Sequence, residues 1–424
     1  MIKEQKTRLI QIGLLLTTVV TTTLAGSEWM HSKYLFFVEE NHLMSWRDFL
    51  NGFKFSIPFL LILTVHEFGH YLTARFHKVK ITLPFYIPLW LGFILVPSFG
   101  TMGAFIRIKD KIKSRIHYFD IGVAGPVAGF LVAVGVIAYG YANLPEPEYV
   151  FEIHPEYEQF GLDYPDHVYT QEFSEQQHFL SYQESRKQDS LTFIEEGKEG
   201  EWYYAEFEAM DSYQNMYFSK PLLFLIVEKY FVVDKARIPN KEEIMHNPYL
   251  LAGLLALFFT ALNLLPIGQL DGGHVIFGLF GDTLSKKISA VLFSIFVFYA
   301  GLGIVSADLM TDTSFDGAIN FLLILIVYLY FLHLCAFSIF EKKRDRWTYA
   351  SVMLALQFGV HTLFGVTGYE GYLLFALVIG RFVGIYHPPV ADHRPLDTKR
   401  IALGVFALII FALSFSPQPF AMSM

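Results

Sequence analysis

An H-E-x-x-H motif in this sequence lies at the end of an apolar stretch that is long enough to cross a membrane. The motif runs from His66 to His70, and the preceding residues from Phe55 to Leu63 carry no charge. Ionisable side chains are costly at membrane depth, so by default they mark a functional site there. The chain must therefore fold so that helices enclose polar side chains within a bilayer.

The spacing of the motif predicts a metal site. On a helix, His66 and His70 are one turn apart on the same face, so both imidazoles can reach one Zn²⁺. Glu67 lies beside them, where a carboxylate can take a proton from water that zinc activates. The alternative is a buried polar cluster that only fixes helix packing, but three ionisable residues within five positions of a span argue against it.

The composition agrees with a polytopic membrane protein that carries one soluble insertion. Only 17% of the 424 residues are charged and 53% are hydrophobic, whereas a soluble protein carries about 25% charged residues. Between residues 143 and 246, acidic residues outnumber basic ones by 22 to 8. An acidic insertion on a mildly basic membrane body argues against nucleic-acid binding. The only cysteine, Cys335, excludes an intramolecular disulfide and a cysteine-based zinc finger.

The predicted fold class is an all-α polytopic membrane protein with about eight or nine transmembrane helices. We also expect a re-entrant or short β segment near the active site and one extracytoplasmic soluble insertion. The five predicted parts are residues 1–52, a first transmembrane helix or signal peptide with an outside loop; 53–143, a membrane core with the H-E-x-x-H span; 144–247, the acidic insertion; 248–274, a span with a second polar motif; and 275–424, C-terminal transmembrane helices.

Residues 81–106 are apolar but interrupted by proline and glycine, among them Pro84, Gly100 and Gly103. Irregular backbone at membrane depth is tolerated only where it is buried in protein or lines a wet cavity. We therefore expect a re-entrant or interfacial segment, with short strands, beside the active site.

Basic residues follow the H-E-x-x-H span from Arg75 to Lys80 and the interrupted segment from Arg107 to Arg115. By the positive-inside rule, these ends face the cytoplasm. This orientation puts the insertion outside and the metal motif towards the inside. Because the sequence shows no obvious transit peptide, we expect a bacterial inner membrane, with an organelle membrane as the alternative.

A second polar motif interrupts the later span between Asn263 and Asp271, where Pro266 and Gly268 break the helix. A catalytic zinc needs a third protein ligand and an open position. Asp271 is the expected ligand, because topology puts it on the same side of the membrane as His70. His274 is a rival, since it follows three positions later and shares a face with Asp271 if the chain is helical there.

The motif H-E-F-G-H in one span, with N-x-x-P-x-x-x-x-D-G in a later one, resembles the site-2 protease family of intramembrane zinc metalloproteases. The Gly125-Pro126 segment between them also fits that family, and the resemblance covers about residues 53–273 apart from the insertion. The insertion lacks a Gly-rich carboxylate-binding loop, so the chain is similar to the PDZ-free members, with extra C-terminal helices.

The resemblance implies zinc ligands at His66, His70 and Asp271, with Glu67 as general base. It implies that Asn263 binds substrate backbone or stabilises an oxyanion, although a membrane asparagine often only bonds a neighbouring helix. The implied reaction is regulated intramembrane proteolysis, the cleavage of a peptide bond in a membrane-embedded substrate helix. The expected partners are membrane proteins with a transmembrane helix and the lipid bilayer.

Two other functions have to be weighed. A pseudoprotease that only binds helices would have no need of Glu67. A metal transporter would place ionisable residues in several spans, whereas in this sequence they cluster in two motifs. The histidines of the insertion, His154, His167 and His178, are interpreted as surface residues. The sequence indicates no role for the segment from His387 to Asp392.

Overall fold

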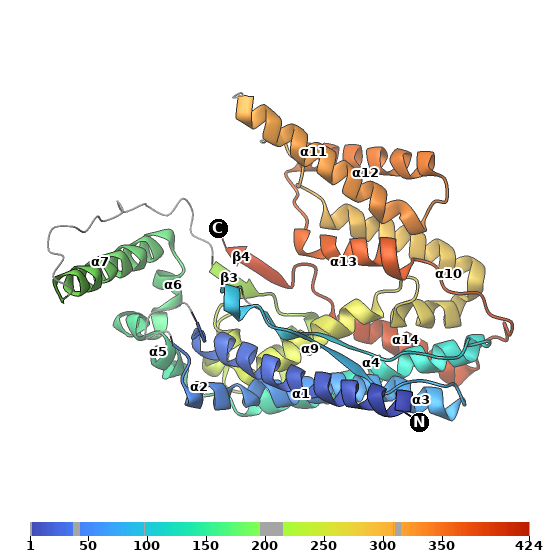
Figure 1. Ribbon diagram of the computed structural model, residues 1–424, viewed down its shortest axis with the longest axis horizontal. Helices are drawn as coiled ribbons and strands as arrows, with labels where there is room; N and C mark the ends of the chain where they lie inside the picture. Colours follow the sequence, from blue (N-terminus) through green and yellow to red (C-terminus); the bar gives the residue numbers. More distant parts are fainter. Residues whose placement is uncertain are drawn as a thin grey trace.

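The computed structural model describes residues 2–36, 43–96, 98–195, 215–307, 309 and 315–423. These residues form long helices and two small antiparallel sheets (Figure 1). Helices α1, α3, α4, α9 and α14 form one packed layer, while α11, α12 and α13 form a second group to one side (Figure 1). The insertion, with α5, α6 and α7, lies at the other end of the layer.

Five helical stretches among the described residues are long and apolar enough to cross a membrane. They are Glu4–His31 in α1 (Ile2–His31), Trp46–Phe76 over α2 (Trp46–Asn51) and α3 (Phe53–Phe76), Arg115–Ala142 (α4), Asp271–Ala300 (α10) and Gly317–Ser338, which includes most of α11 (Phe315–Cys335). The apolar helix α9 (Pro248–Leu264) is shorter. The helical membrane fold is confirmed, and the larger number of spans stays a prediction.

Three more helices lie in the predicted C-terminal part, residues 275–424. They are α12 (Lys343–Phe364), α13 (Leu373–Val378) with a π-helical continuation Ile379–Val383, and α14 (Thr398–Ser414). Helix α12 begins with a charged turn, and the π-helical turn ends α13 early. Both features shorten the apolar part of these helices.

Helix α4 lies at the centre of the layer and packs against α3, α9 and α10. Glycines allow this close approach. A Cβ atom at Gly69 of α3 would lie 2.6 Å from the carbonyl oxygen of Ala124 in α4, so only glycine lets the two backbones meet there. Fully buried side chains such as Phe55, Phe59 and Leu250 fill the space between the helices.

The interrupted segment forms a hairpin of β1 (Phe85–Leu89) and β2 (Gly100–Phe105), so the predicted short strands are confirmed. It packs on α1, where the Thr21 hydroxyl donates to the Gly100 carbonyl oxygen at 2.7 Å. The hydroxyls of Tyr86 and Thr64 are 2.7 Å apart. Because Thr64 is two residues before His66, the hairpin lies beside the H-E-x-x-H helix.

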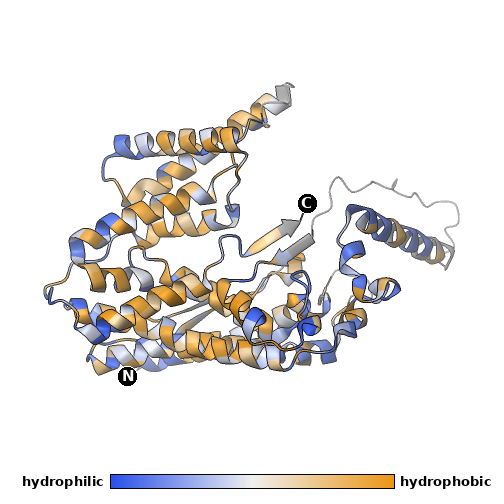
Figure 2. Ribbon diagram, turned by 180° about the vertical axis from the view of Figure 1, so that it is seen from behind, coloured by the Kyte–Doolittle hydropathy of each residue, from blue (hydrophilic) through white to orange (hydrophobic). Residues whose placement is uncertain are grey.

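The described part of the insertion is mainly helical. Its elements are α5 (Val150–Ile153), α6 (Pro165–Val168), α7 (Gln171–Glu195), α8 (Leu222–Tyr230), short 3-10 segments and strand β3 (Asn215–Phe218). Helix α7 is largely hydrophilic, in contrast to the helices of the packed layer (Figure 2). Strand β3 pairs with the last strand, β4 (Phe420–Ser423), which joins the insertion to a segment about two hundred residues later.

Candidate metal centre and active site

Three predicted metal ligands meet between α3 and α10. The Nε2 atoms of His66 and His70 are 3.0 Å apart, and the Asp271 Oδ2 atom is 3.4 Å from the first and 3.2 Å from the second. A tetrahedral zinc with ligand bonds of 2.0–2.1 Å separates neighbouring ligand atoms by about 3.3 Å. The three donors therefore fit one zinc ion.

The helix α3 fixes the two histidines and the neighbouring acid. His70 Nδ1 donates to the Ile121 carbonyl oxygen of α4 at 2.7 Å, and this bond leaves the Nε2 lone pair for a metal. Glu67 follows His66 in the same helical turn and is only 7% exposed. A buried carboxylate next to the ligand group is placed to exchange protons with a substrate there.

Asp271 reaches the group because the chain turns sharply before it. It is the first residue of α10, whereas Asn263 lies in α9, so the interruption expected between these two residues separates two helices. A Cβ atom at Gly272 would lie 2.0 Å from the Leu264 carbonyl oxygen, and one at Gly273 would lie 2.2 Å from that of Gly268. These two glycines let α10 start directly against the end of α9.

The glycines of α4 have a closer link to the site than sequence reasoning indicated. A Cβ atom at Gly125 would lie 2.1 Å from His70 Nε2, and one at Gly129 would lie 3.0 Å from His66 Cβ. The sequence linked Gly125 to the family resemblance but not to either histidine. The repeat of small residues four apart, in a span between two metal motifs, was the signal that could have pointed to the histidines.

The rival ligand His274 lies outside the group of described residues that could hold a metal ion. Its ring lies 5.1 Å from the Tyr118 ring and 5.0 Å from the His387 ring, measured between centroids. The described structure thus brings Asp271, and not His274, to the two histidines. Asn263 lies in the last turn of α9 and is half-buried, and its amide makes no hydrogen bond to the described residues.

The segment from His387 to Asp392, which had no predicted role, attaches to the start of α4. The backbone N–H groups of Ala391 and Asp392 donate to the Lys113 carbonyl oxygen at 3.0 and 2.9 Å, and the Ser114 hydroxyl donates to Asp392 Oδ2 at 3.1 Å. The Arg394 guanidinium holds the pKa of the Asp392 carboxyl well below its usual range, so this carboxylate stays charged.

His387 stacks on Phe277 of α10, with ring centroids 3.7 Å apart. Burial, with a smaller contribution from the nearby His274, lowers the pKa of His387 to about 3. The His387 ring is therefore neutral at physiological pH. It also lies against His274, the fourth residue of α10, with ring centroids 5.0 Å apart.

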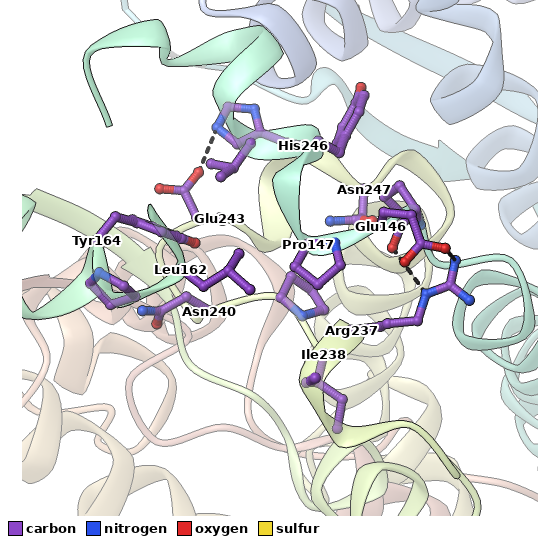
Figure 3. Close-up of a pocket in the computed structure, with 16 residues that line it drawn as sticks. Glu146, Pro147, Leu162, Tyr164, Arg237, Ile238, Asn240, Glu243, His246 and Asn247 are labelled. Atoms are coloured by element: carbon purple, nitrogen blue, oxygen red, sulfur yellow. Dashed lines mark hydrogen bonds and ion pairs between the residues drawn. The ribbon is translucent and has the colours of Figure 1, made fainter. Parts of the chain in front are cut away.

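A second group of ligand-type side chains lies in the insertion, far along the chain from the first. His154 is half-buried and meets Glu243 and His246, so its interpretation as a surface residue was wrong. Glu243 and His246 are both buried, and they are among the residues that line a pocket (Figure 3). The E-x-x-H spacing of residues 243–246 was the sequence signal, but nothing in the sequence linked it to His154.

Comparisons with known proteins agree with the first site. The family model for peptidase family M50 matches residues 54–305. The probable zinc metalloprotease EGY2, chloroplastic, of Oryza sativa subsp. indica is 23% identical over 54% of this chain and 30% of its own length. The probable zinc metalloprotease EGY1, chloroplastic, of Arabidopsis thaliana is 25% identical over 52% of this chain and 28% of its own length. The chain thus spans less than a third of these relatives, and no solved structure matches it.

Proposed function

Because the chain belongs to peptidase family M50, we propose that it is an intramembrane zinc metalloprotease that hydrolyses peptide bonds within or near transmembrane segments of other membrane proteins. The observation that carries this proposal is the convergence of His66, His70 and Asp271 beside Glu67. Two of the candidate spans supply these residues, so the chemistry takes place in or at the membrane.

The proposed roles follow from the chemistry of each side chain. His66, His70 and Asp271 would hold the ion, and zinc bound there would act as a Lewis acid on the scissile carbonyl and on water. Glu67 accepts the proton that the attacking water loses, and it then donates this proton to the leaving amine. The half-buried Asn263 amide is free to bond the substrate backbone or a developing oxyanion.

A helical substrate must unwind before cleavage, because its carbonyl groups are hydrogen-bonded within the helix. We propose that the hairpin of β1 and β2 binds the unwound segment by pairing along a strand edge. The sheet has only two strands among the described residues, and the contact between Tyr86 and Thr64 keeps it beside the site. Substrate would then lie between the hairpin and α3.

We place the metal centre towards the cytoplasmic side of a bacterial inner membrane, with residues 144–247 outside. The basic segments after α3 and β2 support this orientation through the positive-inside rule. The plant relatives are named as chloroplastic, which supports an organelle membrane as the alternative. Labelling of single cysteines placed in the loops of intact cells, in a Cys335→Ser background, would test the orientation.

The decisive experiment compares the wild type with Glu67→Gln, using zinc content and cleavage of a transmembrane test substrate. We expect zinc in both proteins and cleavage only by the wild type, because glutamine keeps the size of the side chain but cannot accept the proton. Equal cleavage by both proteins would remove Glu67 as general base. Cleavage by neither, in all substrates tested, would favour a helix-binding pseudoprotease.

A further inference from the structure

The ligand-type side chains of the insertion gather where it joins the membrane core. His154 follows α5, while Glu243 and His246 lie at the 3-10 segment Ile244–His246 directly before α9. Figure 3 shows the Glu243 carboxylate and the His246 ring facing one another. The mechanism proposed above uses none of these residues.

The donor atoms have the spacing of a metal site. The Nε2 atoms of His154 and His246 are 3.2 Å apart, and Glu243 Oε2 lies 3.0 Å from His246 Nε2 and 3.9 Å from His154 Nε2. The point at equal distance from these three atoms is about 2.0 Å from each, which is the length of a zinc bond to nitrogen or carboxylate oxygen. One ion can therefore contact all three without movement of the backbone.

Each of the three side chains also has the outer partner that zinc ligands have in proteins. The His246 Nδ1–H group donates to the Met30 carbonyl oxygen at 2.9 Å. His154 Nδ1 lies 3.3 Å from a carboxylate oxygen of Glu156. The remaining carboxylate oxygen of Glu243 accepts a hydrogen bond from the Tyr169 hydroxyl.

These outer bonds determine which atoms face the centre. A carbonyl or carboxylate oxygen can only accept, so both Nδ1 atoms carry a proton, and in the neutral rings both Nε2 atoms present a lone pair. Glu243 Oε2 is buried and makes no hydrogen bond in the described structure. With both rings neutral, three acceptors thus converge at 3.0–3.9 Å, and a buried arrangement of this kind is a ready-made site for a cation.

We propose that His154, Glu243 and His246 form a second zinc site, separate from the catalytic one. A cavity of about 440 Å³ borders Glu243 and His246, and it leaves room for water in the fourth position. The ion would clamp the start of the insertion to the segment before α9. The bond from His246 to Met30 would extend this clamp to the end of α1.

Zinc content of the purified full chain tests the proposal. We expect about two zinc ions per wild-type chain and about one in Glu243→Gln and in His154→Ala, because each variant lacks one of three ligands. Asp271→Asn should also hold about one, and the Glu243→Gln/Asp271→Asn double variant none. His167→Ala is the matched control, since this histidine of the same insertion stacks on Phe160 outside the group, and it should hold two.

The variants separate this proposal from the proposed protease activity. The second site is supported if Glu243→Gln holds one zinc ion fewer than the wild type and Asp271→Asn still holds the zinc ion of the insertion site. This conclusion does not depend on the result of the cleavage assay. If wild type, Glu243→Gln and His154→Ala hold equal amounts of zinc, the second site does not exist. His154 is partly exposed and tolerates truncation better than buried Glu243, so a folded, monodisperse His154→Ala protein decides the matter even if Glu243→Gln aggregates.

Discussion

Replacement of Gly125 by alanine should remove the catalytic zinc while leaving the helix that carries it intact. The added Cβ atom would lie 2.1 Å from His70 Nε2 and 2.5 Å from two further atoms of the same ring, whereas real Cβ atoms essentially never approach closer than 3.0 Å. The ring of His70 or the backbone of α4 must therefore move by about 1 Å, several times the tolerance of about 0.2 Å in zinc–ligand distances.

The size of the effect can be bounded. Disturbing only the outer partners of a zinc ligand costs 10–100-fold in affinity, so displacing His70 itself should cost about 100-fold or more. When zinc is near saturation, a 100-fold loss removes about 2.7 kcal/mol of zinc-linked stability. Alanine is a better helix former than glycine by about 1 kcal/mol, so the substitution should not by itself destabilise helix α4.

The assay is zinc content together with the melting temperature, measured with and without added zinc. Gly135→Ala is the matched control, because it lies on the same helix and its Cβ would meet nothing within 4 Å. We expect Gly135→Ala to match the wild type in both measurements. If Gly125→Ala keeps the wild-type zinc content and melting temperature, then Gly125 is not needed to leave room for His70, and the packing argument is refuted.

Further predictions concern the surroundings of the site. Arg400→Met should lower the free energy of unfolding by about 1–3 kcal/mol, because the Arg400 guanidinium donates to both carboxylate oxygens of Asp120 at 2.7 and 2.9 Å. A double-mutant cycle with Asp120→Asn tests this pairing, and strictly additive losses of stability would contradict it. The free energy of unfolding should fall as pH drops from 6.5 towards 3, because the His387 ring binds a proton in this range when the chain is unfolded. In the folded protein the pKa of this ring is lowered to about 3, so it does not bind the proton there. The melting temperature of His387→Phe should therefore depend less on pH than that of the wild type. Gly103→Val should slow cleavage with zinc still bound, since Gly103 has a φ of +102° that valine disfavours and its Cβ would meet no other atom within 4 Å; an unchanged rate would count against substrate pairing with β2.

The grouping of the three candidate metal ligands was predictable because local spacing and membrane context carry their signal. His66 and His70 are brought together by a single helical turn, so their spacing in the sequence is enough to predict that they meet. Asp271 could be selected because it lies in a polar break within an otherwise apolar span. The short strands β1 and β2 agree with prolines and glycines that exclude a continuous helix, but their pairing with one another was not predicted.

Other contacts depend on how distant segments pack, and the sequence shows no local sign of them. The approach of Gly125 to His70 depends on the relative rotation of α3 and α4. The meeting of His154 with His246 spans 92 residues of an insertion without a clear hydropathy period. The position of Asp271 at the start of α10 also depends on packing, because Gly272 and Gly273 lie against the backbone of Leu264 and Gly268.

The pairing of β3 with β4 restricts the topology of the whole second half of the chain. Two hydrogen-bonded strands lie at the same level relative to the bilayer, so if this sheet lies outside the hydrocarbon region, the polypeptide between Phe218 and Phe420 must cross the bilayer an even number of times. Helices α9 and α14 lie within this interval and are both too short to count among the five long spans. A reporter group placed at β4 must face the same side as the insertion, so a single accessibility measurement at each strand checks the parity of every crossing between them.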